Sequence, residues 1–219
     1  MFVRFLPVHW TQSGNSSSLA LVPSLADGWL VITAGGRRLR DVSRRPAPTV
    51  VALHVDGSEK PATLRGAPGT HPSSELNSHL AIHDDHRCRR GVDHHIVVHA
   101  QPLRLVFLSH LADISTRSSI PLGATTAVSG SHGGISNTGT PRQMDATAGA
   151  LARTHAVVWA KHGIVTRSDV SATQAADLIE YLEAAAAYEV MNLSMGEPAV
   201  GLAPASAMPS HVPSVLAYE

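Results

Sequence analysis

The sequence has little of several residue types, and each shortage excludes a class of protein. One cysteine, Cys88, among 219 residues excludes an internal disulfide framework and fits a reducing compartment such as the cytoplasm. Neither sign of charge is in excess, because Lys plus Arg and Asp plus Glu both number 17. We therefore expect neither a nucleic acid nor a membrane as a partner. No apolar run approaches the ~18 residues that a bilayer span requires.

Aromatic residues make up only 4% of the chain, whereas histidine occurs 14 times. The apolar share of 43% and the charged share of 16% exclude a disordered chain and fit one domain with a full core. We expect that domain to span residues 1–200 and the tail-like residues 201–219 to be disordered. Because histidine is the commonest metal ligand, its abundance raises the question of a metal site.

Short apolar runs alternate along the chain with helical patterns. Runs rich in β-branched residues predict strands at residues 29–33 and 49–55, and buried strands at 96–99 and 156–160. Amphipathic or Ala-rich patterns predict helices that begin near residues 73, 103, 142 and 171. Residues 60–72 are rich in Pro, Gly and Thr and predict a loop. The alternation predicts an α/β or α+β domain in which helices cover a sheet.

One segment, residues 116–139, does not fit this pattern. Ser, Thr and Gly account for 14 of its 24 residues, and Arg117 is its only strongly charged residue. A structureless loop of that length is unusual inside a compact domain. The segment is therefore either a flexible insert or a stretch that has lost its pattern, for example through a slip of the reading frame.

Three short clusters carry side chains that could perform chemistry. His99 and Gln101 end a predicted strand and, being two residues apart, point the same way. His162 follows another strand, and Gly163 beside it would allow a ligand or backbone to approach closely. Each histidine could equally be a packed core residue.

The third cluster is Ser73-Ser74-Glu75, at the start of a predicted helix. Its hydroxyls and free backbone N–H groups suit an anion such as phosphate. A helix cap formed by Ser73 or Ser74 is the simpler interpretation. Two further histidine groups, within residues 83–86 and 94–95, are predicted to be solvated surface residues.

The order of these motifs resembles the class II aldolase/adducin family. Its elements are Ser-Gly-Asn-Ser-Ser, Thr-Ala-Gly-Gly, Ser-Ser-Glu-Leu-x-x-His, a strand ending in His-Ala-Gln, a strand ending in Lys-His-Gly, and a long C-terminal helix. The resemblance covers about residues 10–200 apart from the atypical segment, and is strongest to the rhamnulose-1-phosphate and fuculose-1-phosphate aldolases. It implies a central, mostly antiparallel sheet flanked by helices in three layers, usually assembled as a homotetramer.

The resemblance also assigns roles to the candidate residues. The family's zinc ligands fall on His99, Gln101 and His162, and its acid/base glutamate falls on Glu75. Gln101 stands where the aldolases have a histidine, and a glutamine oxygen is a weaker zinc donor than imidazole. Zinc would thus be held less tightly, replaced by another divalent metal, or absent.

The phosphate pocket of the family maps onto four positions, namely Asn15, Gly35, Ser73 and Ser74. The implied reaction is the metal-dependent cleavage of a ketose 1-phosphate to dihydroxyacetone phosphate and an aldehyde. Two alternatives stay open. One is a non-catalytic, adducin-like assembly domain, which Gln101 and the atypical segment favour, and the other is a sugar-phosphate 4-epimerase on the same scaffold.

Overall fold

The computed structural model describes residues 6–8, 19–57, 61–92, 94–111, 125–128 and 141–196. In these ranges helices are combined with mostly antiparallel strands, which confirms the expected fold class. The described strands differ from the expectation in one respect, because they form two four-stranded sheets and not one central sheet.

The first sheet is antiparallel throughout and has the order β1-β4-β3-β2. Its strands are β1 (Leu6–Val8), β2 (Trp29–Thr33), β3 (Val50–Val55) and β4 (Pro61–Gly66). The strands predicted at 29–33 and 49–55 are confirmed, but the loop predicted over 60–72 is wrong where β4 lies. Proline is tolerated at the first position of a strand, as Pro61 is here. Gly66 lies so close to Val51 that a Cβ would come within 2.9 Å of its Cγ1, so this glycine serves packing and not a turn.

The second sheet has the order β5-β8-β7-β6, with only the β6–β7 pair parallel. Its strands are β5 (Ile96–Ala100), β6 (Thr125–Val128), β7 (Ala156–Trp159) and β8 (Gly163–Ser168). Strand β8 is not apparent in the sequence, because Thr166, Arg167 and Ser168 interrupt its apolar pattern although all three are buried. A tight turn joins β7 to β8, with the His162 N–H donating to the Trp159 carbonyl at 3.0 Å.

Among the described strands, β5 lies at the edge of its sheet and pairs with β8 alone. For that reason all five of its residues are half-buried, and the prediction of a fully buried strand at 96–99 is wrong in this respect. Strand β2 lies at an edge of the first sheet, and β2 and β5 line the same cavity.

Part of the atypical segment takes regular structure. Its residues Thr125–Val128 form β6, parallel to β7, so the segment is not structureless throughout. The remainder of residues 116–139 lies outside the described residues, as do residues 201–219 and Asn15.

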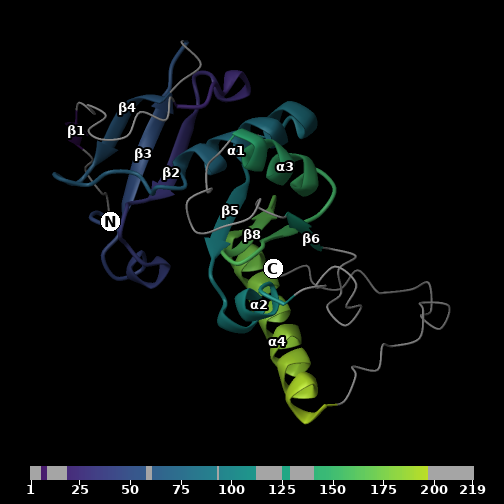
Figure 1. Ribbon diagram of the computed structural model, residues 1–219. Coiled ribbons are helices and arrows are strands. Elements are labelled where there is room, and N and C mark those ends of the chain that lie inside the picture. The colour runs from purple at the N-terminus through teal and green to yellow at the C-terminus, as the bar shows by residue number, and fades with distance from the viewer. Residues whose placement is uncertain are drawn as a thin grey trace, which may run out of the picture.

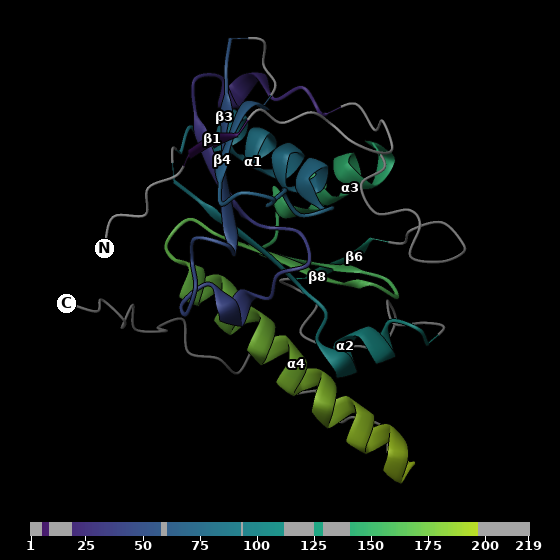
Figure 2. The same ribbon diagram turned by 90° about the vertical axis from the view of Figure 1, so that its left-hand side faces the viewer.

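Four helices cover the second sheet on both faces (Figures 1 and 2). They are α1 (Leu76–Arg90), α2 (Leu103–Leu108), α3 (Pro141–Leu151) and α4 (Ala172–Met195). Helices α1 and α3 lie side by side on one face, and α2 and α4 pack together on the other. Both long helices end at a glycine with a left-handed backbone, Gly91 after α1 and Gly196 after α4, as their sequences predict.

The alternation of side chains along β7 explains this layering. Ala156 and Val158 face the cluster formed with α2 and α4, whereas Val157 and Trp159 face the cluster formed with α1 and α3. The second sheet is thus the middle of three layers. In the described part of the chain, no helix is long and apolar enough to cross a membrane.

Candidate active site

Two histidines from distant parts of the chain come together at the edge of the second sheet. The rings of His99 and His162 are nearly parallel, with an angle of 6° and 5.0 Å between their centroids. The pairing of β5 with β8 explains the contact, because Ala100 lies opposite Ile164 and the turn before β8 carries His162. We call His99 and His162 the histidine pair.

Gly163 makes this approach possible. A Cβ at this position would collide with the Ala100 carbonyl oxygen, would lie 2.8 Å from His99 Cε1 and would lie 3.3 Å from Gln101 Cγ. The expected role of this glycine in a close approach is therefore confirmed. Since His99 and Gln101 both surround Gly163, the structure brings three residues singled out in the sequence to one place.

The hydrogen bonding of His99 determines which of its nitrogens is available. Its Nδ1 lies 3.0 Å from the Ile164 carbonyl oxygen, and since a carbonyl only accepts, Nδ1 carries the proton and donates it. The lone pair of a neutral ring is then on Nε2. Burial lowers the pKa of His99 to about 4, with a smaller contribution from His162, so the ring is neutral at pH 7.

His162 directs Nε2 toward Glu75, the residue that precedes α1. The distance from this nitrogen to Glu75 Oε1 is 3.8 Å, which permits an electrostatic attraction but is too long for a hydrogen bond. Both side chains are largely buried, with exposed fractions of 14% for His162 and 12% for Glu75. Among the described residues, His162 Nε2 has no hydrogen-bond partner.

The histidine pair fits a divalent cation. Metal-bound imidazoles are neutral and often donate their second N–H to a backbone carbonyl, as His99 does. The buried Nε2 of His162 makes no hydrogen bond to a described residue, so this nitrogen is open to a ligand. No set of three His, Cys, Asp or Glu side chains that could hold a metal occurs in the described ranges, so a third protein ligand would have to be Gln101 or a residue outside them. Gln101 is exposed and adjoins the histidine pair through Gly163.

The phosphate-binding positions are brought together in part. A bridge between Ala34 and Pro72 places Gly35 beside the chain that leads to Ser73. Two backbone donors are used within this bridge, because Gly35 N–H donates to the His71 carbonyl at 2.8 Å and Ser73 N–H to the Thr33 carbonyl at 3.0 Å. Of the described groups expected to hold phosphate, the hydroxyls of Ser73 and Ser74 remain, and Asn15 lies outside the described residues.

The predicted serine cap of α1 is not formed. Glu75 is the N-cap residue of α1, and no side chain caps this helix. The Ser73 hydroxyl oxygen instead accepts from the Glu75 N–H at 3.3 Å, before the helix begins. This arrangement holds the backbone of Glu75 where its side chain lines the cavity.

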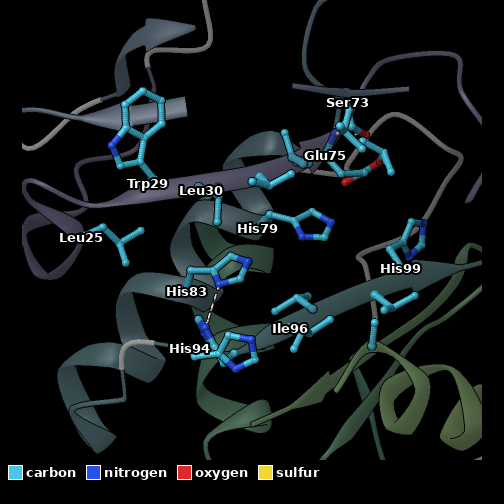
Figure 3. A pocket seen from close by; sticks show the side chains of 18 of the residues that line it. Leu25, Trp29, Leu30, Ser73, Glu75, His79, His83, His94, Ile96 and His99 are labelled. Atoms are coloured by element: carbon cyan, nitrogen blue, oxygen red, sulfur yellow. Dashed lines mark hydrogen bonds between the residues drawn. The ribbon is translucent and has the colours of Figure 1, made fainter. Parts of the chain in front are cut away.

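A cavity of about 670 Å³ lies between β2 and β5. Figure 3 shows Ser73, Glu75, His79 and His99 around one part of it, and His83 and His94 farther along. His79 lies four residues after Glu75 and therefore on the same face of α1. No role was predicted for His79 from the sequence. Burial, assisted by His99, lowers the pKa of His79 to about 4.

The other histidines of α1 are not surface residues, and the prediction that they are solvated is wrong. His83 and His86 are both buried. His83 Nδ1 lies 3.0 Å from a ring nitrogen of His95, and His86 Nε2 lies 2.7 Å from Asp169. This face of α1 is polar in composition but packs toward β5 and the end of β8, which a helical pattern alone does not reveal. His94, by contrast, is exposed as expected.

Comparisons with known proteins agree with this architecture. The family described as Class II Aldolase and Adducin N-terminal domain matches residues 8–190. A rhamnulose-1-phosphate aldolase from Pectobacterium atrosepticum is 30% identical over 188 residues, covering 80% of this chain and 67% of that one. A rhamnulose-1-phosphate aldolase from Yersinia pseudotuberculosis is 29% identical over 184 residues with the same coverage.

Solved structures share the fold. A sugar-phosphate aldolase from Thermotoga maritima superposes with a TM-score of 0.63 at 24% identity, covering 90% of this chain and 87% of that one. An L-fuculose 1-phosphate aldolase gives a TM-score of 0.55 at 20% identity over 80% of this chain and 75% of that one. The fold is thus one that solved sugar-phosphate aldolases share. The chain belongs to the class II aldolase and adducin family.

Proposed function

We propose that the chain is a metal-dependent aldolase that cleaves a ketose 1-phosphate, such as rhamnulose or fuculose 1-phosphate, to dihydroxyacetone phosphate and an aldehyde. The observation that carries the proposal is the convergence of the histidine pair with Glu75, of which His99 and Glu75 line the cavity. Similarity to the rhamnulose-1-phosphate aldolases supports this substrate class. We place the protein in the cytoplasm, since its single cysteine fits a reducing compartment.

In this proposal His99 and His162 hold a divalent cation, zinc or another, with the Gln101 amide oxygen as a third donor. A bound cation supplies Lewis-acid polarisation of the substrate carbonyl. The Glu75 carboxylate moves a proton at the substrate carbon beside that carbonyl, for which its place in the cavity wall next to His162 is suitable. The Ser73 and Ser74 hydroxyls, with Asn15, orient the phosphate away from the bond that breaks, whereas Gly35 adds no donor because its N–H is bound to the His71 carbonyl.

Replacing the acid/base group tests this assignment. In the variant Glu75→Gln, aldehyde release from rhamnulose 1-phosphate or fuculose 1-phosphate should fall by about 10²- to 10⁴-fold, because the amide can neither donate nor accept the proton. The measurement is a coupled aldehyde assay at saturating metal. An unchanged rate would remove Glu75 from the reaction, and no aldehyde from either substrate with the parent protein would contradict the substrate class.

A second candidate function is a non-catalytic assembly domain, which the exposed Gln101 favours. Metal analysis of purified protein, together with Gln101→His, separates the two. The aldolase proposal expects near-stoichiometric divalent metal in the variant, since it restores a stronger donor. If neither protein holds a divalent ion, the aldolase proposal is lost.

We also propose a homo-oligomer, a tetramer by resemblance to the family. Large apolar side chains remain exposed along the outer face of α4, including Tyr181, Tyr188, Met191 and Met195. Apolar patches of this kind are typical of surfaces that are covered in an assembly. Light scattering should give four times the chain mass of 23.1 kDa. A mass equal to that of one chain would contradict the proposed homo-oligomer.

A further inference from the structure

Trp159 contacts both members of the histidine pair. Its ring centroid lies 4.8 Å from that of His99 and 5.6 Å from that of His162, with the planes tilted by 38° and 32°. Trp159 is the last residue of β7, three residues before His162, and is almost fully buried. The two imidazoles thus share one rigid neighbour.

The indole is itself held in place by a second residue. Its Nε1–H donates to Thr147 Oγ1 at 2.9 Å, and Thr147 is fully buried in α3. A planar ring with one buried hydrogen bond has few alternative positions. A continuous set of contacts therefore runs from α3 through Trp159 to both imidazoles.

We infer that Trp159, anchored by Thr147, is a positioning residue that sets the direction of the two imidazole Nε2 atoms toward the cation. The inference rests on the proposed metal site. Groups behind the ligands of a metal commonly decide its affinity, because they fix the orientation of the ligands before the ion arrives. Among the described residues, the Thr147 hydroxyl hydrogen-bonds to the Trp159 indole and to neither histidine, so its effect would be transmitted through the indole.

Removal of the Thr147 hydroxyl is the direct experiment. Thr147→Val keeps the shape of the side chain but leaves the indole N–H without its acceptor. The Trp159 ring is then no longer held in one orientation by a hydrogen bond. We expect the dissociation constant for Co²⁺, measured by equilibrium dialysis on the full chain, to rise roughly tenfold or more. Thr147→Ser restores the hydroxyl and should restore the affinity.

A matched control removes a buried hydroxyl elsewhere. Thr166 is also fully buried, and its Oγ1 donates to the Ala175 carbonyl at 2.8 Å, away from Trp159. Thr166→Val should therefore leave the Co²⁺ affinity unchanged. An equal loss of Co²⁺ affinity in Thr147→Val and Thr166→Val would show a general loss of packing and overturn the inference.

A spectroscopic readout tests the same contact without activity. With Trp10→Phe and Trp29→Phe, Trp159 is the only tryptophan left, and Co²⁺ bound beside it should quench its emission with the same dissociation constant. Equal affinities of the parent and Thr147→Val, or Co²⁺ binding without quenching, would overturn the inference while leaving the metal site intact. A parent protein that binds no Co²⁺ would overturn the proposed function as well. Trp159→Phe, which removes the N–H and keeps an aromatic ring, provides a second variant if Thr147→Val does not fold.

Discussion

At the scale of single residues, the candidate site depends on close approaches that only particular side chains allow. Gly163 lets β8 begin against the Ala100 carbonyl and brings His162 beside His99. His99 is kept neutral by burial and donates through Nδ1 to Ile164. These two features leave the Nε2 lone pair of His99 available to a cation.

Adding one methyl group at Gly163 should therefore damage both fold and site. Gly163→Ala would place a Cβ against the Ala100 carbonyl and 2.8 Å from His99 Cε1, and we expect a loss of about 1–3 kcal/mol in the free energy of unfolding together with weaker metal binding. Urea denaturation and metal titration measure the two effects. Gly149→Ala is the matched control, because a Cβ there, in the last turn of α3, meets nothing within 4 Å, and it should stabilise the protein by roughly 0.5–1 kcal/mol. If Gly163→Ala changed neither the free energy of unfolding nor metal binding, the close approach of Gly163 to Ala100 and His99 would be contradicted.

At the scale of secondary-structure elements, the contact between α1 and β5 depends on uncharged histidines. Burial holds the pKa of His83 well below its usual value, and His95 has a pKa lowered to about 4 by burial and by His86. His86 also has a lowered pKa, mainly through burial, although Asp169 opposes that shift. Arg90 and Arg167 face the same group of rings and make protonation of His86 less favourable.

These shifts predict that acid destabilises the protein over a defined range. The unfolded histidines take up protons near pH 6.5, whereas the folded His79 and His95 do so only near pH 4. The unfolded state thus binds more protons in between, so stability is full above pH 6.5 and falls as the pH is lowered toward 4. A shift of this size corresponds to roughly 3 kcal/mol for one well-buried histidine.

Urea midpoints measured from pH 7.5 to 4 test this explanation. His95→Asn removes one titrating ring, so the decline in stability below pH 6.5 should be shallower than in the parent protein. His110→Asn, at an exposed position in the loop after α2, is the control and should follow the parent. Identical pH profiles for all three proteins would contradict the role assigned to the buried rings.

At the scale of the whole molecule, the sequence predicts the succession of elements better than their pairing. The strands at 29–33, 49–55, 96–99 and 156–160 are found because each is a compact apolar run. Strand β8 was missed because buried Thr166, Arg167 and Ser168 find partners in other elements, and a linear pattern does not show such partners. For the same reason His99, His162 and Glu75 could be nominated singly, but their convergence needed the pairing of β5 with β8.

Arg167 shows how such partners hold the molecule together. It is 2% exposed, its Nε–H donates to the Leu151 carbonyl at the end of α3, and its guanidinium lies 3.4 Å from Asp169. Arg167→Met should cost about 2–4 kcal/mol in the free energy of unfolding, since it leaves a buried carbonyl and a carboxylate short of a partner. Arg89→Met is the comparison, because Arg89 forms an exposed pair with Asp85 and should cost under about 1 kcal/mol. If urea denaturation gave Arg167→Met and Arg89→Met the same loss in the free energy of unfolding, the larger contribution assigned to Arg167 would be contradicted.

The central claim is that His99 and His162 together hold a divalent cation beside Glu75. Equilibrium dialysis of Co²⁺ against the parent protein, His99→Ala, His162→Ala and the double variant measures it most directly. We predict one ion per parent chain and a loss of binding in either single variant, with little further loss in the double variant. Undiminished binding in the double variant would place the ion elsewhere, for example at His83 and His95, and would contradict the account.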